Sequence, residues 1–404
     1  MPRPSSVLLR ALSPLKSTYQ WSSSSPPVYS IGLSYAGKDS PPFVSPNARP
    51  PRTGFAHLPS GKADHIREWV RASGKITAGR GELESTAVGG WTDAVRDQVA
   101  KWGAGEDFFA LEGLDASISS IGVFQESSIG KNGPVHLAIS DGVGGWSDTV
   151  DPSFFSQALM YHYAKSARKA LESATPENPP KTGPLDHLRD AFEGVLKEPV
   201  VVAGGATACG VSLDSKGVLN GVNLGDSGMS IIRDGKLVYA TPPGTHYFNC
   251  PKQLSKIPRS MMSQGIITDK PDTASDTFTA QLQPGDVIML YTDGLSDNVP
   301  AEHYTLLLSH LSEILARPEN AHLSPLDRAS ELARLFADVL VGYGRAAMVR
   351  TGDEAEEVDG KVRRSWRTPF EVEAEREGMR YKGGKVDDIT VLTAVVSEKN
   401  PESD

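Results

Sequence analysis

The sequence predicts an α+β fold, with helices and antiparallel strands in one main domain. Apolar residues recur at helical spacing over residues 152–173 and 184–197, which predicts two amphipathic helices. Over residues 206–292 the pattern changes to short apolar runs separated by turn residues, which is typical of antiparallel strands. No long low-complexity linker follows Gly105, so we expect residues 28–397 to form one domain.

The composition is that of a loop-rich globular chain. Its 404 residues are 39% apolar and include 39 glycines and 29 prolines. No apolar run reaches the roughly 18 residues of a membrane span. A net charge of −9 and a pI near 5.6 argue against a nucleic-acid-binding surface. Cys209 and Cys250 are too few for a disulfide framework or a zinc site, so we expect reduced thiols.

The N-terminal segment has the composition of a targeting peptide. Residues 1–38 contain no Asp or Glu, but they carry four basic residues and many serines. This composition is typical of a transit peptide, and no unbroken apolar core of a secretory signal is present. We predict that residues 1–27 direct import into the mitochondrion, with the matrix as the expected compartment. The alternative is an N-terminus that is merely disordered.

The domain is expected to begin with a strand followed by a long insertion. Tyr29–Tyr35 alternates well enough for a first strand. Residues 37–65 are rich in Pro, Gly and Ser and predict an extended loop. Amphipathic spacing predicts helices over Ala63–Ser73 and Asp93–Trp102. We therefore interpret residues 37–103 as a loop and helix insertion.

The segment after the insertion combines adjacent carboxylates with a helix. Gly105–Gly113, read GEDFFALEG, places Glu106 and Asp107 at the start of a strand-like run. If the strand is regular, the two side chains face opposite ways. Within the helix predicted at 152–173, we expect His162 to belong to the packed face.

The second half is expected to contain a run of strands, two helices and a last strand. Turn residues separate short strand-like runs, which we interpret as an antiparallel meander: Ala206–Asp214, Val218–Leu224, Met229–Ala240 and Asp286–Thr292. Helical spacing returns over Ala301–Ala316 and Leu326–Gly342, and a last strand is expected at Ile389–Val396. Residues 398–404 are expected to be a disordered tail.

Three strand ends carry aspartates that could form one site. The segment SDGVGGW follows an apolar run and places Asp141 and the Gly142 carbonyl where the backbone can be approached closely. Asp293 and Asp387 stand at two further Asp-rich strand ends. Such oxygens are the ligands that hard divalent cations prefer. If the three strand ends converge, they would form a cage for two metal ions.

The predicted chemistry follows from charge neutralisation. Three adjacent carboxylates would raise one another's pKa values unless cations neutralise them. We expect two Mg²⁺ or Mn²⁺ ions about 3.5–4 Å apart, with Asp141 and a hydroxide between them. Such a hydroxide is suited to in-line attack on a phosphate monoester. No side-chain nucleophile is evident, because no GxSxG motif and no reactive cysteine context occurs.

Six motifs occur in an order that identifies a family resemblance. They are GED at Gly105, DGVGGW at Asp141, GGATAC at Gly204, NLGDSG at Asn223, YTDGLSDN at Tyr291 and VDDITV at Val386. In this order they resemble the motifs of the metal-dependent type-2C (PPM) Ser/Thr protein phosphatases over roughly residues 28–397. DGVGGW, GGKVDD and the segment THYFNCPKQL at Thr245 resemble the mitochondrial branch in particular.

The resemblance implies a fold and a set of ligands. The fold would be a four-layer α-β-β-α sandwich with a binuclear site at one edge of two antiparallel sheets. Asp141 would bridge both metals, Gly142 would offer its carbonyl, and Asp293 and Asp387 would complete one metal shell; the three aspartates would carry catalysis. Four further ligands would act directly, through water, or at a weaker third metal: Glu106, Asp107, Asp226 and Asp297.

Two positions depart from the family pattern. Many relatives have a histidine after the Asp-Gly pair that is proposed as a general acid, and Val143 stands there in this chain. Many also have an arginine four residues before the glutamate of the Glu-Asp pair to bind phosphate, and that position is Trp102. The sequence therefore leaves the phosphate-binding group and the proton donor open.

The sequence favours one function and leaves two alternatives. The favoured function is a Mg²⁺- or Mn²⁺-dependent protein serine/threonine phosphatase that acts as a monomer on phosphoproteins, which we expect to be mitochondrial. One alternative is a pseudophosphatase that binds phosphoproteins without hydrolysing them. The other is a metal-dependent hydrolase of small phosphate esters. The intact set of carboxylates favours an enzyme over a pseudophosphatase.

Overall fold

The structure is a computed structural model of the whole chain. It describes residues 19–22, 25–78, 101–113, 134–173, 182–259, 261, 268–352, 355–358, 361–364 and 366–398. Within this described part, no helix is long and apolar enough to cross a membrane. The predicted helix at Asp93–Trp102 lies outside the described residues except for its last two, and the predicted transit peptide lies outside them up to residue 18.

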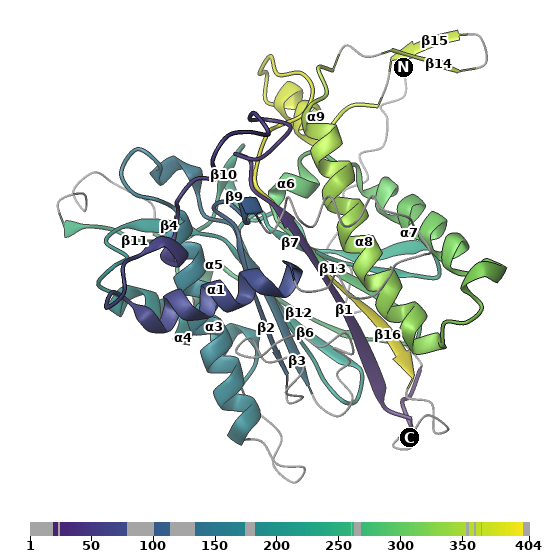
Figure 1. Ribbon diagram of the computed structural model, residues 1–404, viewed down its shortest axis with the longest axis horizontal. Coiled ribbons are helices and arrows are strands. Elements are labelled where there is room, and N and C mark those ends of the chain that lie inside the picture. The colour runs from purple at the N-terminus through teal and green to yellow at the C-terminus, as the bar shows by residue number, and fades with distance from the viewer. Residues whose placement is uncertain are drawn as a thin grey trace.

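Two five-stranded antiparallel sheets form the centre of the molecule (Figure 1). The first sheet has the strand order β1-β16-β13-β7-β8. Its strands are β1 (Pro27–Ala36), β7 (Gly228–Arg233), β8 (Lys236–Ala240), β13 (Val287–Tyr291) and β16 (Ile389–Glu398). β1 and β16, the first and last strands of the described residues, therefore pair with each other, and Pro27 lies opposite Glu398.

The second sheet has the strand order β12-β6-β5-β3-β2. Its strands are β2 (Phe108–Gly113), β3 (Val135–Ser140), β5 (Ala208–Leu213), β6 (Val218–Leu224) and β12 (Asp276–Gln281). Residues 206–292 therefore do not form the single meander that was predicted. The turn at Asp226 carries the chain from β6 in the second sheet to β7 in the first, so the antiparallel strands are shared between two sheets.

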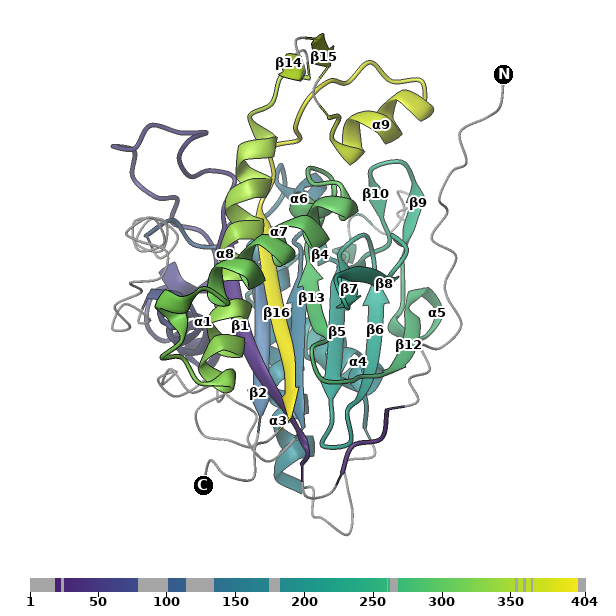
Figure 2. The same cartoon turned by 90° about the vertical axis from the view of Figure 1, so that its right-hand side faces the viewer.

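Helices cover the outer face of each sheet, which completes the predicted four layers (Figures 1 and 2). α8 (Pro325–Met348) packs on β1 and β16, and α7 (Ala301–Leu315) packs beside it. On the other side α3 (Ser153–Ser173) packs on β2 and β3, and α4 (Pro184–Lys197) packs on β5 and β6. α1 (Asp64–Ala78) lies against α3.

The alternation of side chains along the strands explains why the sheets are covered on both faces. Successive residues of a strand point to opposite faces. Phe109 and Leu111 of β2, with Ile139 of β3, belong to the core that the two sheets share with α7 and α8. Phe108 and Ala110 belong to a second core beneath α3 and α4. β2 therefore needs apolar residues at nearly every position.

Helix boundaries follow the local sequence. Pro184 and Pro325 stand at the first positions of α4 and α8, where a missing N–H group costs nothing. Ser324 caps α8, and its hydroxyl accepts a hydrogen bond from the N–H of Asp327 at 3.1 Å. These signals explain why the predicted helices at 63–73, 152–173, 184–197, 301–316 and 326–342 are confirmed, with α8 extending six residues further than expected.

Shorter elements lie around the strand ends and beyond α8. They are η1 (Phe55–His57), η2 (Gly144–Trp146), β4 (Gly204–Ala206), β9 (Thr245–Tyr247), β10 (Cys250–Pro251), β11 (Leu254–Lys256), α5 (Pro271–Ala274), α6 (Asp293–Ser296), η4 (Pro318–Asn320), β14 (Ala355–Val358), β15 (Lys361–Arg364) and α9 (Pro369–Arg376). α9 belongs to an insertion between α8 and β16 that the sequence did not predict as a helix.

Candidate metal centre

Strand pairing brings the first two carboxylates together. β2 pairs with β3 so that Phe108 lies opposite Ser140. Asp107 precedes Phe108 and Asp141 follows Ser140, so both stand at the same end of neighbouring strands. The N–H of Asp141 is held by Thr207 Oγ1 at 3.1 Å, and its carbonyl accepts a hydrogen bond from the N–H of Thr207 at 2.9 Å.

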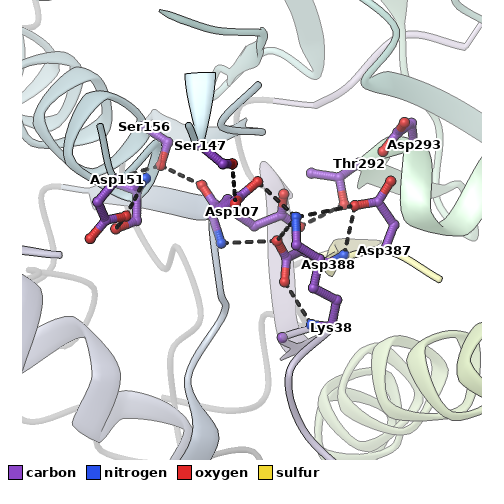
Figure 3. Close-up of polar contacts among 12 residues, drawn as sticks. Lys38, Asp107, Ser147, Asp151, Ser156, Thr292, Asp293, Asp387 and Asp388 are labelled. Atoms are coloured by element: carbon purple, nitrogen blue, oxygen red, sulfur yellow. Dashed lines mark hydrogen bonds and ion pairs between the residues drawn. The ribbon is translucent and has the colours of Figure 1, made fainter. Parts of the chain in front are cut away.

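The first sheet supplies the remaining strand ends. β13 pairs antiparallel with β16, and the N–H of Thr292 donates to the carbonyl of Thr390 at 3.1 Å. Asp293 follows β13 and Asp387 precedes β16, so their side chains stand at one edge of this sheet. Figure 3 shows Asp293 and Asp387 near Asp107 from the second sheet. The predicted convergence of the three strand ends is therefore present in the structure.

The glycine-rich turn is required by close backbone packing. The N–H of Gly142 donates to the carbonyl of Glu106 at 3.1 Å, and the N–H of Val143 donates to the carbonyl of Gly205 at 3.0 Å. A Cβ atom on Gly142 would lie 2.7 Å from the Glu106 oxygen and 3.0 Å from the Pro152 oxygen. A larger residue would push the turn away from Glu106.

The centre of the cluster is formed by Asp141, Asp226 and Asp293. One carboxylate oxygen from each lies within 4.8 Å of the other two. The Oδ1 atoms of Asp226 and Asp293 are buried and have no hydrogen-bond partner among the described residues. A buried carboxylate oxygen without a donor is costly, because it has lost water and gained nothing in return. These oxygens are available to a cation.

Glu106 and Asp107 occupy different environments, as their adjacent positions predicted. Asp107 is fully buried, and its Oδ2 accepts a hydrogen bond from Thr292 Oγ1 at 2.8 Å. Glu106 is half-buried, and its Oε2 accepts a hydrogen bond from Lys38 Nζ at 2.8 Å. Ser147 Oγ donates to the other oxygen of Glu106 at 3.3 Å. Glu106 therefore lies at the outer side of the cluster.

Asp297 and Asp387 share a lysine that sequence reasoning missed. Lys385 Nζ lies 2.7 Å from Asp297 Oδ2, 2.7 Å from Asp293 Oδ2 and 3.1 Å from Asp387 Oδ2. Three of the predicted ligands therefore contact the ammonium group of Lys385, and Glu106 contacts that of Lys38. Lys385 stands in the GGKVDD motif, and the only signal was its place two residues before Asp387.

Asp388 and Lys38 are further members of the site that sequence reasoning missed. Asp388 Oδ1 accepts a hydrogen bond from the N–H of Lys38 at 2.6 Å, and Oδ2 accepts one from the N–H of Glu106 at 3.0 Å. Asp388 therefore ties the loop after β1 to the segment before β2. Lys38 Nζ also lies 3.4 Å from Asp388 Oδ2 and 4.0 Å from Asp387 Oδ1 (Figure 3).

Burial and mutual repulsion raise the pKa values of most of these carboxyls. Burial is the largest cause for Asp107 and Asp141, and the neighbouring carboxylates add to it, so both pKa values lie well above the usual range. The same causes raise the pKa of Asp226. They raise the pKa of Asp297 to about 7 and that of Asp387 to about 6, although Lys385 opposes the rise.

Asp293 is the exception, because Lys385 lowers its pKa. Burial alone would raise the pKa of Asp293, but the charge and hydrogen bond of Lys385 outweigh it, so this pKa is lowered. Burial alone would lower the pKa of Lys385, but Asp293, Asp297 and Asp387 raise it. Asp388 and Glu106 likewise raise the pKa of Lys38 against the effect of burial. Both lysines are therefore cationic at neutral pH.

The residues present fit divalent cations. Within the described part of the chain, eight carboxylates lie near the ammonium groups of Lys38 and Lys385 and the guanidinium group of Arg345, which leaves an excess of five negative charges when all are ionised. The Oδ1 atoms of Asp226 and Asp293 are buried without a donor among the described residues, so a cation could bind to both. Carboxylate and carbonyl oxygens are the donors that Mg²⁺ and Mn²⁺ prefer.

A recess opens beside the cluster at Trp102, one of the two positions that depart from the family pattern. It encloses about 370 Å³, including space open to solvent, and it is lined by Lys38, Trp102, Thr53, Glu106 and Asp388 among others. Trp102 is nearly buried and cannot provide a charge. Lys38 is the cation that lines this recess.

The chain is similar to several known phosphatases, although no family model matches it. It is 34% identical over 265 residues to a protein phosphatase PTC7 homologue of Xenopus laevis, covering 65% of this chain and 77% of that protein. The PTC7 homologue of Homo sapiens is 34% identical over 265 residues, covering 65% and 75%. The 5-azacytidine resistance protein azr1 of Schizosaccharomyces pombe is 31% identical over 267 residues, covering 66% and 78%.

Among solved structures, the photosystem II phosphatase PBCP aligns with 72% of this chain and 92% of its own, at 24% identity and a TM-score of 0.49. The assignment of the family depends on the sequence relatives, about three quarters of whose length matches this chain. By this similarity the chain belongs to the PPM (type-2C) family of protein phosphatases and resembles its PTC7 members.

Proposed function

We propose that this protein is a Mg²⁺- or Mn²⁺-dependent phosphatase that hydrolyses phosphoserine and phosphothreonine in proteins. The observation that carries the proposal is the convergence of Asp141, Asp226 and Asp293 at one edge of the two sheets, with buried oxygens that lack donors. Membership of a protein phosphatase family gives the reaction class. The preference for serine and threonine and the need for metal are parts of the proposal.

The proposed metal ligands are the carboxylates at the strand ends. Asp141 would be shared by two ions, with the Gly142 carbonyl, Asp293 and Asp387 as further ligands. Glu106, Asp107 and Asp226 would act directly or through water. Bound ions would supply Lewis-acid polarisation of the phosphate and lower the pKa of water, which provides the nucleophile.

Lys38 is the group that we assign to the phosphate. Its ammonium group is held by Glu106 and Asp388 at the mouth of the site, and about 29% of its side chain is exposed. Because Lys38 lines the recess beside the cluster, its charge would be available to an incoming phosphate oxygen. Lysine binds phosphate as a point charge, without the paired geometry of an arginine. This assignment provides the cation that Trp102 does not.

A pseudophosphatase would have the same carboxylates and bind the same phosphoproteins, but it would not release phosphate. A phosphoserine peptide incubated with the full chain and Mn²⁺ should release inorganic phosphate, and EDTA should abolish the release. Binding of the peptide without release would contradict the proposal and favour a pseudophosphatase. Faster hydrolysis of p-nitrophenyl phosphate than of phosphopeptides, compared as kcat/KM at the same Mn²⁺ concentration, would favour a hydrolase of small esters.

The compartment belongs to the same proposal. We propose import into the mitochondrion, because residues 1–38 are free of acidic residues and rich in serine. We propose that residues 1–27 are removed after import and that the mature protein is a monomer. Trp21 Nε1 donates to the carbonyl of Leu282 at 3.0 Å, and removal of this segment would break that contact. A reporter fused to residues 1–40 should enter mitochondria, and a reporter that stays diffuse in the cytosol would contradict the proposal.

A further inference from the structure

Lys385 is bound among the proposed metal ligands rather than beside them. Its ammonium group contacts one oxygen each of Asp293, Asp297 and Asp387, at 2.7, 2.7 and 3.1 Å. Its side chain is only 18% exposed. Two of these oxygens, from Asp293 and Asp297, accept hydrogen bonds from the ammonium group, and the Asp387 oxygen forms an ion pair with it. The lysine therefore places a positive charge among three of the carboxylates.

The side chain of Asn298 fixes the backbone of Lys385. Its N–H donates to Asn298 Oδ1 at 2.9 Å, and its carbonyl accepts from Asn298 Nδ2 at 2.8 Å. Asn298 is fully buried and also donates to the carbonyl of Gly294 at 2.9 Å. Asn298 follows Asp297 directly, so the lysine and the α6 turn that carries Asp293 and Asp297 are held in one arrangement.

The insertion between α8 and β16 also contacts Lys385, through the ring of Phe370. The ring of Phe370, in α9, lies with its centroid 5.2 Å from Lys385 Nζ, a distance suited to a cation–π contact. The N–H of Phe370 donates to the carbonyl of Asp297 at 2.9 Å. Phe370 is itself nearly buried. An ammonium group enclosed in this way is part of the folded site and does not extend freely into solvent.

The carboxylate oxygens fall into two groups around this lysine. Oδ2 of Asp293 and Oδ2 of Asp297 are bound to the ammonium group. Oδ1 of Asp293 and Oδ1 of Asp226 are buried and have no donor among the described residues. Asp293 therefore stands at the boundary, with one oxygen toward the lysine and one available to a metal ion. Asp297 lies on the lysine side.

We propose that the ammonium group of Lys385 occupies Asp297 and prevents this carboxylate from binding a metal ion. The centre would then bind two divalent ions and exclude a third. The inference rests on the proposed function for the presence of the two ions. A third ion bound to Asp297 would have to displace the Lys385 ammonium group or lie next to it. Two positive charges that are neighbours in a partly buried site repel each other strongly. The lysine thus sets the metal stoichiometry and orients Asp293.

The test measures the number of Mn²⁺ ions bound per chain and does not depend on enzymatic activity. Equilibrium dialysis of the full chain against increasing Mn²⁺, followed by metal analysis, should saturate at two ions per chain. Lys385→Met removes the charge and keeps much of the side-chain volume, so this variant should take a third ion in the concentration range where the wild type holds two. Lys236→Met is the matched control: it makes the same change in the exposed β7–β8 turn, at the far end of the first sheet, and should leave two ions.

Two more variants keep the inference testable if Lys385→Met does not fold. Lys385→Arg retains the charge and should still bind two ions. Asp297→Asn removes a carboxylate that is reserved for the lysine, so it should also leave two ions. Loss of an ion in Asp297→Asn, three ions in the wild type, or two ions in a folded Lys385→Met across the whole range would overturn the inference.

The number of bound ions tests the role of Lys385, and phosphate release tests the proposed function, so either can be refuted without the other. Release of phosphate from a phosphopeptide by a wild-type chain that holds three ions would refute the role of Lys385 and leave the proposed function intact. Two bound ions without any phosphate release would refute the proposed function and support the stoichiometry that Lys385 is proposed to set.

Discussion

At the scale of single residues, the site depends on charges that come from distant parts of the chain. Lys38 and Asp388 are 350 positions apart, yet the N–H of one donates to the carboxylate of the other at 2.6 Å. Aspartates at strand ends could be recognised from sequence because the Asp-Gly turn and the preceding apolar run mark them. A lysine in a loop has no such mark, so Lys38 and Lys385 required the structure.

Replacement of Lys38 tests whether its ammonium group binds the phosphate. Lys38→Met should raise KM for a phosphopeptide and weaken inhibition by inorganic phosphate, each by about tenfold or more, because a hydrogen bond to a charged group contributes about 1.5–3 kcal/mol. Lys38→Arg should restore much of both. Steady-state kinetics at saturating Mn²⁺ provide the measurement.

The control for Lys38 separates phosphate binding from metal binding. Lys38→Met should keep the Mn²⁺-induced rise in melting temperature, since Lys38 is not a proposed ligand, and Lys236→Met should keep every parameter. An unchanged KM together with unchanged phosphate inhibition in Lys38→Met would show that the phosphate is bound by another group.

At the scale of elements, the contact between β3 and α4 contains an acid-sensitive pair. His136 of β3 and His187 of α4 are buried, and their ring centroids lie 4.9 Å apart. Burial lowers the pKa of His136 to about 3, with a further contribution from His187. Burial also lowers the pKa of His187 to about 4, against the opposite effect of Asp186 and Asp190. Both rings are neutral in the folded protein at pH 7.

The pair makes stability fall in mild acid. Because the folded pKa values lie below the unfolded value of about 6.5, the unfolded chain binds protons first as the pH falls, and the free energy of unfolding decreases from about pH 6.5 down to about pH 4 and below. At pH 5 each histidine would cost about 2 kcal/mol relative to pH 7. His136→Phe should therefore lose about half of this decrease in urea unfolding at pH 7 and pH 5. Parallel curves for variant and wild type would contradict the assignment.

Elements also show where pattern reasoning reaches its limit. The helices and strands were predictable from apolar periodicity and from Pro and Ser at helix starts, as α4 and α8 show. The division of the strands between two sheets was not, because pairing depends on contacts far apart in sequence, such as β1 with β16. The α9 insertion was missed because its mixed charges hide the short helical face that carries Phe370 and Ala374.

At the scale of the whole molecule, the fold explains why the acidic cluster exists. Two sheets that pack face to face leave their strand ends side by side (Figure 2). Every predicted carboxylate ligand is attached to such an end or to the turn beside it. The packed cores on both faces hold these ends against charge repulsion. If divalent ions bind as proposed, they would recover the free energy that repulsion costs, and the stability of the molecule would then depend on its metal content.

The central claim is that this cluster is a divalent metal centre that hydrolyses phosphate esters, and Asp141→Asn tests it most directly. Asparagine keeps the shape of the side chain but removes its charge. With Mn²⁺ at saturation, phosphopeptide hydrolysis should fall at least about a hundredfold, roughly 2.7 kcal/mol. The Mn²⁺-induced rise in melting temperature should shrink, and the metal-free melting temperature should stay equal or increase, because repulsion is relieved.

Asp234→Asn, in the exposed β7–β8 turn, is the matched control and should behave as the wild type in both measurements. The decisive comparison is phosphate release by Asp141→Asn and by the wild type across a Mn²⁺ titration. The account predicts loss of release with an intact fold. Near wild-type turnover of Asp141→Asn at saturating Mn²⁺ would contradict it.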